Sequence, residues 1–430
     1  MAFFMREEET LDRQGLAALQ RGKLAAMLKA VLKANAFYRS KLDGLSFDPE
    51  RDPITDLPFT TRSEIQQDQA DHPPYGTNLS HPLQSYVRLH QTSGSLGRPI
   101  RWLDRPEDWA WWRRCWGIVF SAAGILDDDR FMFPFSFGPF IGFWAAFDAA
   151  VSMKHLCLTA GGMTTTARLR FMLDNDVTVI ACTPTYTLRM AEVAAAEGLS
   201  LADSTVRALI VGGEPGGSIP TTRERIESAW GARVFDHPGM TETGPHSFEC
   251  VEAPGGVHVM ESEFIPEVID PETTEPVADG ESGELVITNL GRWGSPLIRY
   301  RTGDCVRMTR GRCACGRSFA RLEGGIVGRL DDMFIIRGNN VYPAAIEAIL
   351  RRFGGVAEFR MEVVEAESMT NLRIEIEPTP DADQAGLAVE VSRAVRNGLN
   401  FRPDIRLVEP GALPRFEMKA RRWVRVKEDE

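Results

Sequence analysis

Four short apolar segments recur between residues 129 and 215, and the stretches between them have the spacing of amphipathic helices. The segments read FMFPFSF, HLCLTAG, VTVIACTP and VRALIVGGEP. Strands that alternate with helices are typical of a mostly parallel sheet flanked by helices. Ligands of such sheets bind beyond the carboxyl ends of the strands. The first candidates for a site are therefore the residues at those ends, which are Phe137–Phe140, Thr183–Pro184 and Gly212–Pro215.

The length and charge of the chain indicate which kinds of binding partner it can have. The chain has 430 residues, of which 43% are hydrophobic and 25% charged, so it is long enough for one large domain and a smaller one. A net charge of -11 argues against nucleic acid and anionic membranes, because both are bound through accumulated Lys and Arg. The N-terminal segment turns acidic and no run of eighteen apolar residues occurs. We therefore expect a cytoplasmic protein that acts on small molecules.

A loop rich in glycine and hydroxyl groups lies between two predicted strands in YVRLHQTSGSLGRPIRW, residues 86–102. Such a loop can present backbone N–H groups to phosphate oxygens. The same composition also occurs in ordinary hairpin connections, and the spacing is not that of a Walker A motif. The candidate phosphate contacts are Thr92, Ser93, Gly94, Ser95 and Gly97.

Three later stretches carry charged residues next to turns. VFDHPGMTETG, residues 234–244, predicts a strand and a turn that holds Thr241 and Glu242. GELVITNLGRWGSPLIRYRTGD, residues 283–304, predicts two strands and ends in Asp304. GRLDDMFIIRGNNVYPAAIE, residues 328–347, predicts a strand at 333–336, a turn at 337–340 and a helix from Pro343.

The last hundred residues predict a small α+β unit. Helices are expected at 343–353 and 383–399, and strands near 358–365, near 371–377 and in RLVEP. A basic tail follows.

Cysteine and histidine form two separated pairs. Cys250 and His258 lie in FECVEAPGGVHV, and Cys313 and Cys315 lie in RCACGRS. Two such pairs on turns could make a tetrahedral zinc site, although four unrelated residues remain the alternative. We expect core thiols at the other cysteines, which are Cys115, Cys157, Cys182 and Cys305.

Taken together, these stretches resemble the adenylate-forming superfamily of acyl- and aryl-coenzyme A ligases, above all its phenylacetate-coenzyme A ligase branch. The loop at 92–98 is similar to the phosphate loop SSGTTGKP, with Leu96 and Arg98 at two changed positions. HPGMTE is similar to YGxTE, with Pro238 in place of the tyrosine, and YRTGD matches in full. The tail LPRFEMKARRWVRV resembles PRSEGKAKRV, with Lys419 at the lysine and Met418 at the glycine.

The resemblance implies an α/β fold with a large N-terminal domain, residues 1–330, and a small mobile α+β domain, residues 331–430, hinged at Asp331. It implies Lys419, Thr241 and Glu242 as catalytic residues, with Glu242 also holding magnesium. It places the nucleotide at the phosphate loop, with Thr92, Ser93, Gly94, Ser95, Gly97 and Arg98, and at Gly213, Glu214, Pro215, Asp236, His237, Pro238, Asp304 and Arg329. The acid is expected among Phe137, Phe140, Gly213, Gly239, Met240 and Pro245.

The implied reaction is ATP-dependent activation of a carboxylic acid, followed by transfer to coenzyme A. Phenylalanines at one strand end, with glycines that leave space, favour a flat aromatic acid. The expected ligands are ATP, Mg²⁺, coenzyme A and a structural Zn²⁺, and dimers are common in the resembled branch. Two alternatives stay open from the sequence: transfer to an amine or a carrier-protein thiol, and a ligand sensor that has lost catalysis.

Overall fold

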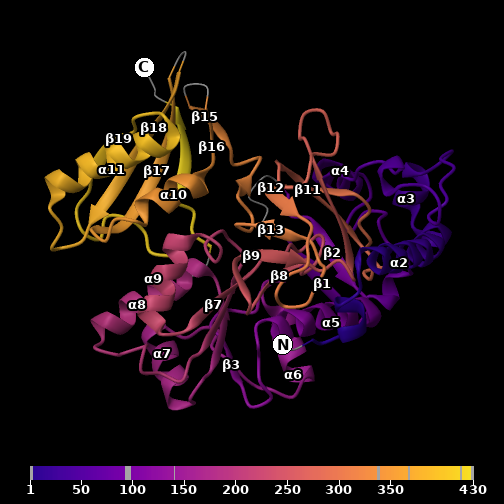
Figure 1. Ribbon diagram of the computed structural model, residues 1–430, viewed down its shortest axis with the longest axis horizontal. Coiled ribbons are helices and arrows are strands. Elements are labelled where there is room, and N and C mark those ends of the chain that lie inside the picture. The colour runs from indigo at the N-terminus through magenta and orange to yellow at the C-terminus, as the bar shows by residue number, and fades with distance from the viewer. Residues whose placement is uncertain are drawn as a thin grey trace.

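The apolar segments between residues 129 and 215 form the predicted parallel sheet. The protein was studied as a computed structural model, which describes residues 3–92, 98–139, 141–336, 339–366, 369–416 and 419–427. The sheet has five parallel strands in the order β4-β3-β5-β6-β7 (Figure 1). Its strands are β3 (Arg130–Phe133), β4 (Leu156–Thr159), β5 (Val179–Cys182), β6 (Ala208–Gly212) and β7 (Arg233–His237).

Helices cover both faces of this sheet because successive side chains of a strand point to opposite faces. Ile210 and Phe235 pack in one hydrophobic cluster, whereas their neighbours Leu209 and Val234 pack in another. The first cluster includes side chains of α5 (Pro106–Ala122) and α6 (Trp144–Ser152). The second includes side chains of α7 (Thr165–Asp174), α8 (Pro184–Ala196) and α9 (Pro220–Trp230), and Figure 1 shows these three helices side by side.

A second, antiparallel sheet follows in the chain. Its order is β10-β11-β12-β13-β9-β8, with β14 paired to β12. The sequence predicted two of these strands, β11 and β12, but not the antiparallel sheet they belong to. No described helix lies between β8 and β14, and short connections without helices join antiparallel neighbours. The strands are β8 (Ser247–Cys250), β9 (Ala253–Val259), β10 (Phe264–Ile269), β11 (Ser282–Asn289), β12 (Tyr300–Thr309), β13 (Arg321–Glu323) and β14 (Gly328–Arg329).

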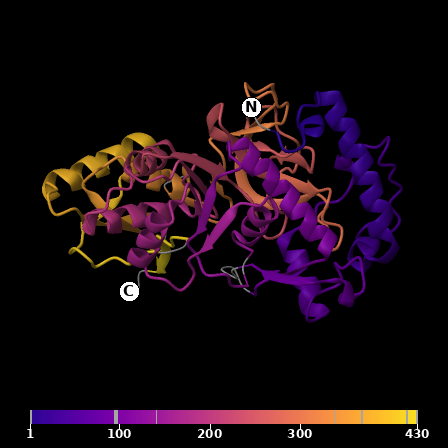
Figure 2. The ribbon, with the colours of Figure 1, turned by 90° about the horizontal axis from the view of Figure 1, so that it is seen from below.

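The N-terminal residues form helices at one end of the molecule (Figure 2). Thr61 caps α4 through a capping box with Glu64. Buried Glu9 accepts a hydrogen bond from Nε of Arg317 at 2.8 Å, which fixes α1 against the loop after β12. The elements are α1 (Arg6–Glu9), α2 (Arg13–Ala34), α3 (Ala36–Lys41), η1 (Ile54–Asp56), α4 (Arg62–Asp71), η2 (Leu83–Ser85), β1 (Arg88–Gln91) and β2 (Arg101–Asp104).

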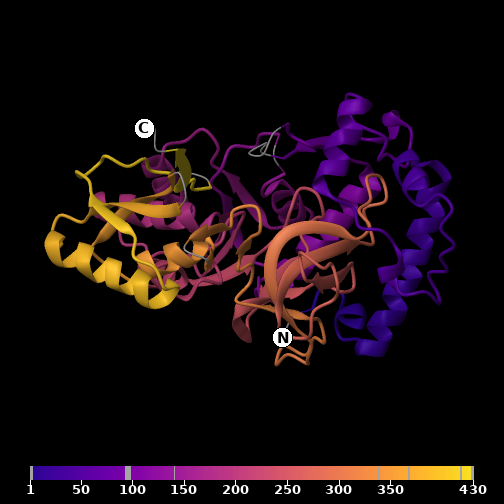
Figure 3. The ribbon, with the colours of Figure 1, turned by 90° about the horizontal axis from the view of Figure 1, so that it is seen from above.

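The C-terminal residues build a small α+β unit at the opposite end from the N-terminal helices (Figure 3). It has its own hydrophobic cluster and a four-stranded sheet in the order β19-β18-β17-β20. Its elements are β15 (Phe334–Ile336), β16 (Asn339–Val341), α10 (Pro343–Leu350), β17 (Val356–Ala366), β18 (Met369–Pro378), α11 (Gln384–Leu399), β19 (Asp404–Leu407) and β20 (Trp423–Lys427). These elements confirm the α/β fold class predicted from the sequence.

Two local predictions in this unit were wrong. The turn expected at 337–340 does not include Asn339 and Asn340, because these residues pair with β15 as part of β16. The expected basic tail contains a strand, β20, that runs parallel to β17. Trp423 packs against the hydrophobic cluster of the unit, and this burial of an apolar ring favours a strand over a solvated tail.

A buried ion pair connects the fold to the predicted catalytic turn. Arg292 donates to both carboxylate oxygens of Asp104, at 2.7 and 2.9 Å, and both side chains are fully buried. The remaining terminal nitrogen of Arg292 donates to the backbone carbonyls of Thr241 and Glu242, at 2.8 and 3.0 Å. One arginine therefore joins β2 and the β11–β12 connection to the turn after β7.

We expect Asp104→Ala to lower the free energy of unfolding by about 3–5 kcal/mol, because it leaves the charge of Arg292 buried without a counter-charge. Asp279→Ala is the matched control, since Asp279 pairs with Arg310 at a half-exposed site and such pairs contribute about 0–1 kcal/mol. Urea unfolding followed by tryptophan fluorescence measures both. Equal, small effects of the two substitutions would show that the buried pair does not stabilise the fold.

Candidate functional site

Lys419 lies over the carboxyl end of β6. A Cβ atom added to Gly213 would lie 3.2 Å from Cε of Lys419, and Gly213 has φ +90. Any other residue at 213 would therefore strain the backbone and press against the lysine. The structure thus brings together the predicted catalytic lysine and a strand end at which ligands of parallel sheets bind.

Glu214 connects α8 to the C-terminal segment that carries Lys419. One oxygen of its carboxylate accepts the backbone N–H of Ala420, and the other accepts the N–H of Thr185, both at 2.8 Å. Burial raises the pKa of Glu214, although the bond from Thr185 opposes this effect. Arg422 adds a second link, because it donates to the hydroxyl of Thr185 at 3.2 Å. The backbone just after Lys419 is therefore anchored to α8 and to the end of β6, while the neighbouring Pro215 is exposed.

The turn after β7 carries the predicted catalytic pair Thr241 and Glu242. The Glu242 side chain is buried, and its Oε1 accepts a hydrogen bond from Arg62 at 3.1 Å. Arg62 also reaches the hydroxyl of Thr92, at 3.5 Å. Sequence reasoning missed Arg62. The only signal was its position directly after the N-cap Thr61, which makes it the first residue of α4.

The two flanks of the predicted phosphate loop are hydrogen-bonded to each other. Thr92 and Ile100 exchange two hydrogen bonds of 3.0 Å, one of them through the Thr92 hydroxyl. Arg98 is exposed, and its carbonyl accepts from Gln66 at 3.1 Å. Ser93, Gly94, Ser95 and Gly97 lie outside the described residues.

Asp304, Arg329 and Asp331 form one hydrogen-bonded chain. Arg329 donates to Asp304 at 2.9 Å, and its other nitrogens donate to the two oxygens of Asp331 at 2.9 and 3.1 Å. The pairing of β12 with β14 sets Asp304 opposite Arg329. Burial raises the pKa of Asp304 to about 6, against the effect of Arg329. A single arginine thus connects the predicted ribose ligand to the predicted hinge.

Asp236 and His237 end β7 and serve opposite faces of the sheet. The carboxylate of Asp236 accepts from the hydroxyl of Ser218 at 2.5 Å, and burial raises its pKa. The ring of His237 packs on Trp116, with ring centroids 4.2 Å apart. Pro238 accepts the N–H of Ser247 at 3.2 Å through its carbonyl. Asp236, His237 and Pro238, all predicted to contact the nucleotide, therefore have three different sets of neighbours.

The residues predicted to bind the acid lie in two separate parts of the structure. Gly239 is exposed, and a Cβ atom there would lie 3.2 Å from Cα of buried Pro245. Met240 exchanges two backbone hydrogen bonds with Gly244 in the same turn. Phe137 instead contacts the rings of Trp144 and Phe147, with centroids 4.3 and 5.2 Å away. Phe140 lies outside the described residues.

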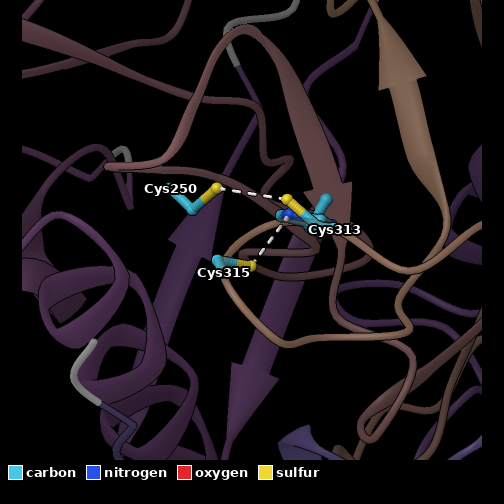
Figure 4. Close-up of side chains that lie close together, drawn as sticks. Cys250, Cys313 and Cys315 are labelled. Carbon is cyan, nitrogen blue, oxygen red and sulfur yellow. Dashed lines mark hydrogen bonds between the residues drawn. The ribbon is translucent and has the colours of Figure 1, made fainter.

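The four predicted zinc ligands lie together although two pairs come from distant parts of the chain. Their ligand atoms all lie within 4.8 Å of one another, and Figure 4 shows the three cysteine sulfurs gathered around one centre. Cys250 and His258 belong to strands β8 and β9, not to turns as expected. Cys313 and Cys315 come from the loop between β12 and β13.

The distances fit a tetrahedral zinc ion. Zinc bonds of about 2.3 Å to sulfur and about 2.0 Å to nitrogen give sulfur–sulfur edges of about 3.8 Å and sulfur–nitrogen edges of about 3.5 Å. The sulfurs of Cys250 and Cys313 are 3.8 Å apart, and Cys315 is 3.6 Å from Nε2 of His258. Nδ1 of His258 lies 3.2 Å from the carbonyl of Phe319, an arrangement that leaves Nε2 free to bind a metal.

Comparison with known proteins identifies two family matches. Residues 109–291 match the family of AMP-binding enzymes, and residues 338–426 match the AMP-binding enzyme C-terminal domain. The first matched range contains β6, β7 and most of α5, and the second contains Lys419.

Full-length relatives give the same assignment. The chain is 31% identical to a phenylacetate-coenzyme A ligase of Thermus thermophilus over 96% of both chains, and 28% identical to that of Escherichia coli over 96% of this chain and 95% of the other. Its structure matches a 2-hydroxyisobutyryl-CoA ligase in the postadenylation state with a TM-score of 0.90 and 27% identity, over 98% of this chain and 92% of the other. The chain therefore belongs to the phenylacetate-coenzyme A ligase branch of the adenylate-forming superfamily, and it is an AMP-forming acid–coenzyme A ligase.

Proposed function

We propose that the enzyme activates an aromatic carboxylic acid with ATP and transfers the resulting acyl group to coenzyme A. The position of Lys419 at Gly213 carries this proposal. A cation at that strand end can meet the charge that develops as a carboxylate attacks the α-phosphate.

Two observations favour an aromatic acid. The relatives in Thermus thermophilus and Escherichia coli are named for phenylacetate. The side of the parallel sheet that faces α5 and α6 is rich in aromatic rings, including Trp116, Phe137 and Phe143. The ligase of similar structure is named for 2-hydroxyisobutyrate, an aliphatic acid, so aliphatic acids belong in any test panel.

In adenylate formation, different residues of the site would bind the ribose, the phosphates and the magnesium ion. Asp304 would accept the ribose hydroxyls, while Thr92, Thr241 and the phosphate loop would donate to phosphate oxygens. Magnesium supplies charge neutralisation when it is bound, and Glu242 is the residue that would hold it. The fit is good, because Glu242 is buried beside the loop and only its Oε1 has a hydrogen bond within the described residues.

The proposal includes two domains, residues 1–330 and 331–430, and a rotation of the second about Asp331. The 2-hydroxyisobutyryl-CoA ligase supports this rotation, because this chain matches its postadenylation state at a TM-score of 0.90 and its thioesterification state at 0.74. Rotation would withdraw Lys419 and open a path for the thiol. A cytoplasmic location and a homodimer remain part of the proposal.

We also propose that Cys250, His258, Cys313 and Cys315 bind a structural zinc ion. Four protein ligands leave no position for water or substrate, so the ion would stabilise the protein without taking part in the reaction. It would tie β8 and β9 to the loop before β13.

Lys419→Ala should lower the rate of adenylate formation by about 10²–10³-fold and leave thioester formation from a supplied acyl-adenylate near the wild-type rate. The lysine contributes charge only to the first step. Pyrophosphate exchange and single-turnover thioester formation measure the two steps. Arg421→Ala is the control, because Arg421 is an exposed cation two residues away. Equal loss in both steps would contradict the assignment.

Asp304→Ala should lower kcat/KM for ATP at least tenfold, since hydrogen bonds to a charged acceptor contribute about 1.5–3 kcal/mol each. In the wild type, kcat/KM for ATP should fall as the pH drops below about 6, where the raised pKa of Asp304 lets the carboxyl take up a proton. In the Asp304→Ala variant, this fall of kcat/KM at low pH should be absent. A pH profile that is the same in both proteins would assign the step to another group.

The purified protein should contain about one zinc ion per chain. Cys315→Ser should lose the ion and lower the melting temperature, because zinc binding is coupled to folding. Elemental analysis and thermal unfolding measure these effects, and Cys157→Ser serves as the control outside the cluster. Metal-free wild-type protein that melts like the metal-containing sample would overturn the zinc proposal.

A further inference from the structure

His237 is the last residue of β7 and pairs in register with Gly212 at the end of β6. Its side chain lies on the same face of the sheet as that of Phe235, toward α5, and packs on Trp116. Asp236 serves the opposite face, where it meets Ser218. The histidine therefore faces the aromatic side of the strand ends.

The hydrogen bonding of the ring fixes the role of each nitrogen. Nδ1 lies 2.8 Å from the backbone carbonyl of Ser247. A carbonyl oxygen only accepts, so Nδ1 carries the proton and Nε2 keeps a lone pair. Burial lowers the pKa of His237 to about 4. The ring is therefore neutral at physiological pH, and Nε2 is a hydrogen-bond acceptor.

Nε2 faces an opening made by glycine. A Cβ atom on exposed Gly239 would lie 3.3 Å from Nε2, and one on Gly212 would lie 3.7 Å from the neighbouring ring carbon Cδ2. The next residue, Gly213, carries the contact with Lys419. Nε2 makes no hydrogen bond to any residue that the structure describes, nor is it among the buried atoms that lack a partner. This acceptor is therefore accessible and close to the reactive end of the site.

We infer that His237 selects the acid: Nε2 accepts a hydrogen bond from a hydroxyl or amino group on the substrate, so the enzyme favours hydroxy- or amino-substituted aromatic acids. The inference rests on the proposed function, because it needs the acid to lie at the ends of β6 and β7. An acceptor that the bound acid encloses, and that only the correct substrate satisfies, rejects analogues without a donor. Trp116 beneath the ring holds the acceptor in a fixed position.

Pyrophosphate exchange with paired acids tests the inference. The panel contains benzoates and phenylacetates with a hydroxyl or amino group at each ring position, each paired with the methyl analogue, which is similar in size but has no donor. We expect at least one pair in which wild-type kcat/KM favours the donor about tenfold or more. His237→Leu should bring that ratio near one, mainly through KM for the acid. His237→Gln, which keeps a side-chain acceptor, should retain more of the preference.

The remaining outcomes separate this inference from the proposed function. If no aromatic acid supports exchange, the proposed function fails and the inference fails with it. If aromatic acids react but no pair shows a preference, or His237→Leu keeps the preference, only the inference is overturned. A change in KM for ATP without a change in the acid ratio would assign His237 to the nucleotide instead. Circular dichroism verifies that both variants fold, and the wild-type panel is decisive even if one does not.

Discussion

The geometry of the site depends on one buried pair of opposite charges. Asp104 ends β2 and Arg292 lies in the distant β11–β12 connection, and neither reaches solvent. A charge in such a place is tolerated only when its partner and its remaining hydrogen bonds are all in place. The nitrogen that Asp104 does not use donates to the turn of Thr241 and Glu242. The position of the predicted magnesium ligand is therefore tied to the same contacts that join β2 to the β11–β12 connection.

Arg62 extends this arrangement toward the phosphate loop. It begins α4, and it contacts both Glu242 and the hydroxyl of Thr92. Its Nε is buried without a partner within the described residues. A cation between the Glu242 carboxylate and the predicted phosphate loop holds the negative side chain in position before any nucleotide or metal arrives.

Features set by local pattern could be predicted from the sequence, whereas features set by long-range contact could not. The parallel strands, the cap at Thr61 and the helix at Pro343 follow from residues within a few positions of each other. Arg62, Asp104 and Arg292 have no such local pattern, because their partners lie up to 188 positions away. Alternation along β7 could have separated Asp236 from His237 before the structure was known, since neighbours in a strand face opposite ways. The cluster of Cys250, His258, Cys313 and Cys315 is the exception among long-range features, because cysteine is rare enough for its spacing to be informative.

The contacts of Glu214 bear on the proposed rotation of the small unit, because they hold the segment next to Lys419 against the large one. Each of its oxygens takes one backbone N–H, one from α8 and one from the segment next to Lys419. Moving the small unit away would leave one oxygen of this half-buried carboxylate without its donor, at a cost of about 1–3 kcal/mol. That cost corresponds to a population ratio of roughly 5- to 150-fold. In the proposed rotation, this one contact would favour the arrangement that holds the lysine at the strand end, and a ligand or water that replaces the lost donor would remove that advantage.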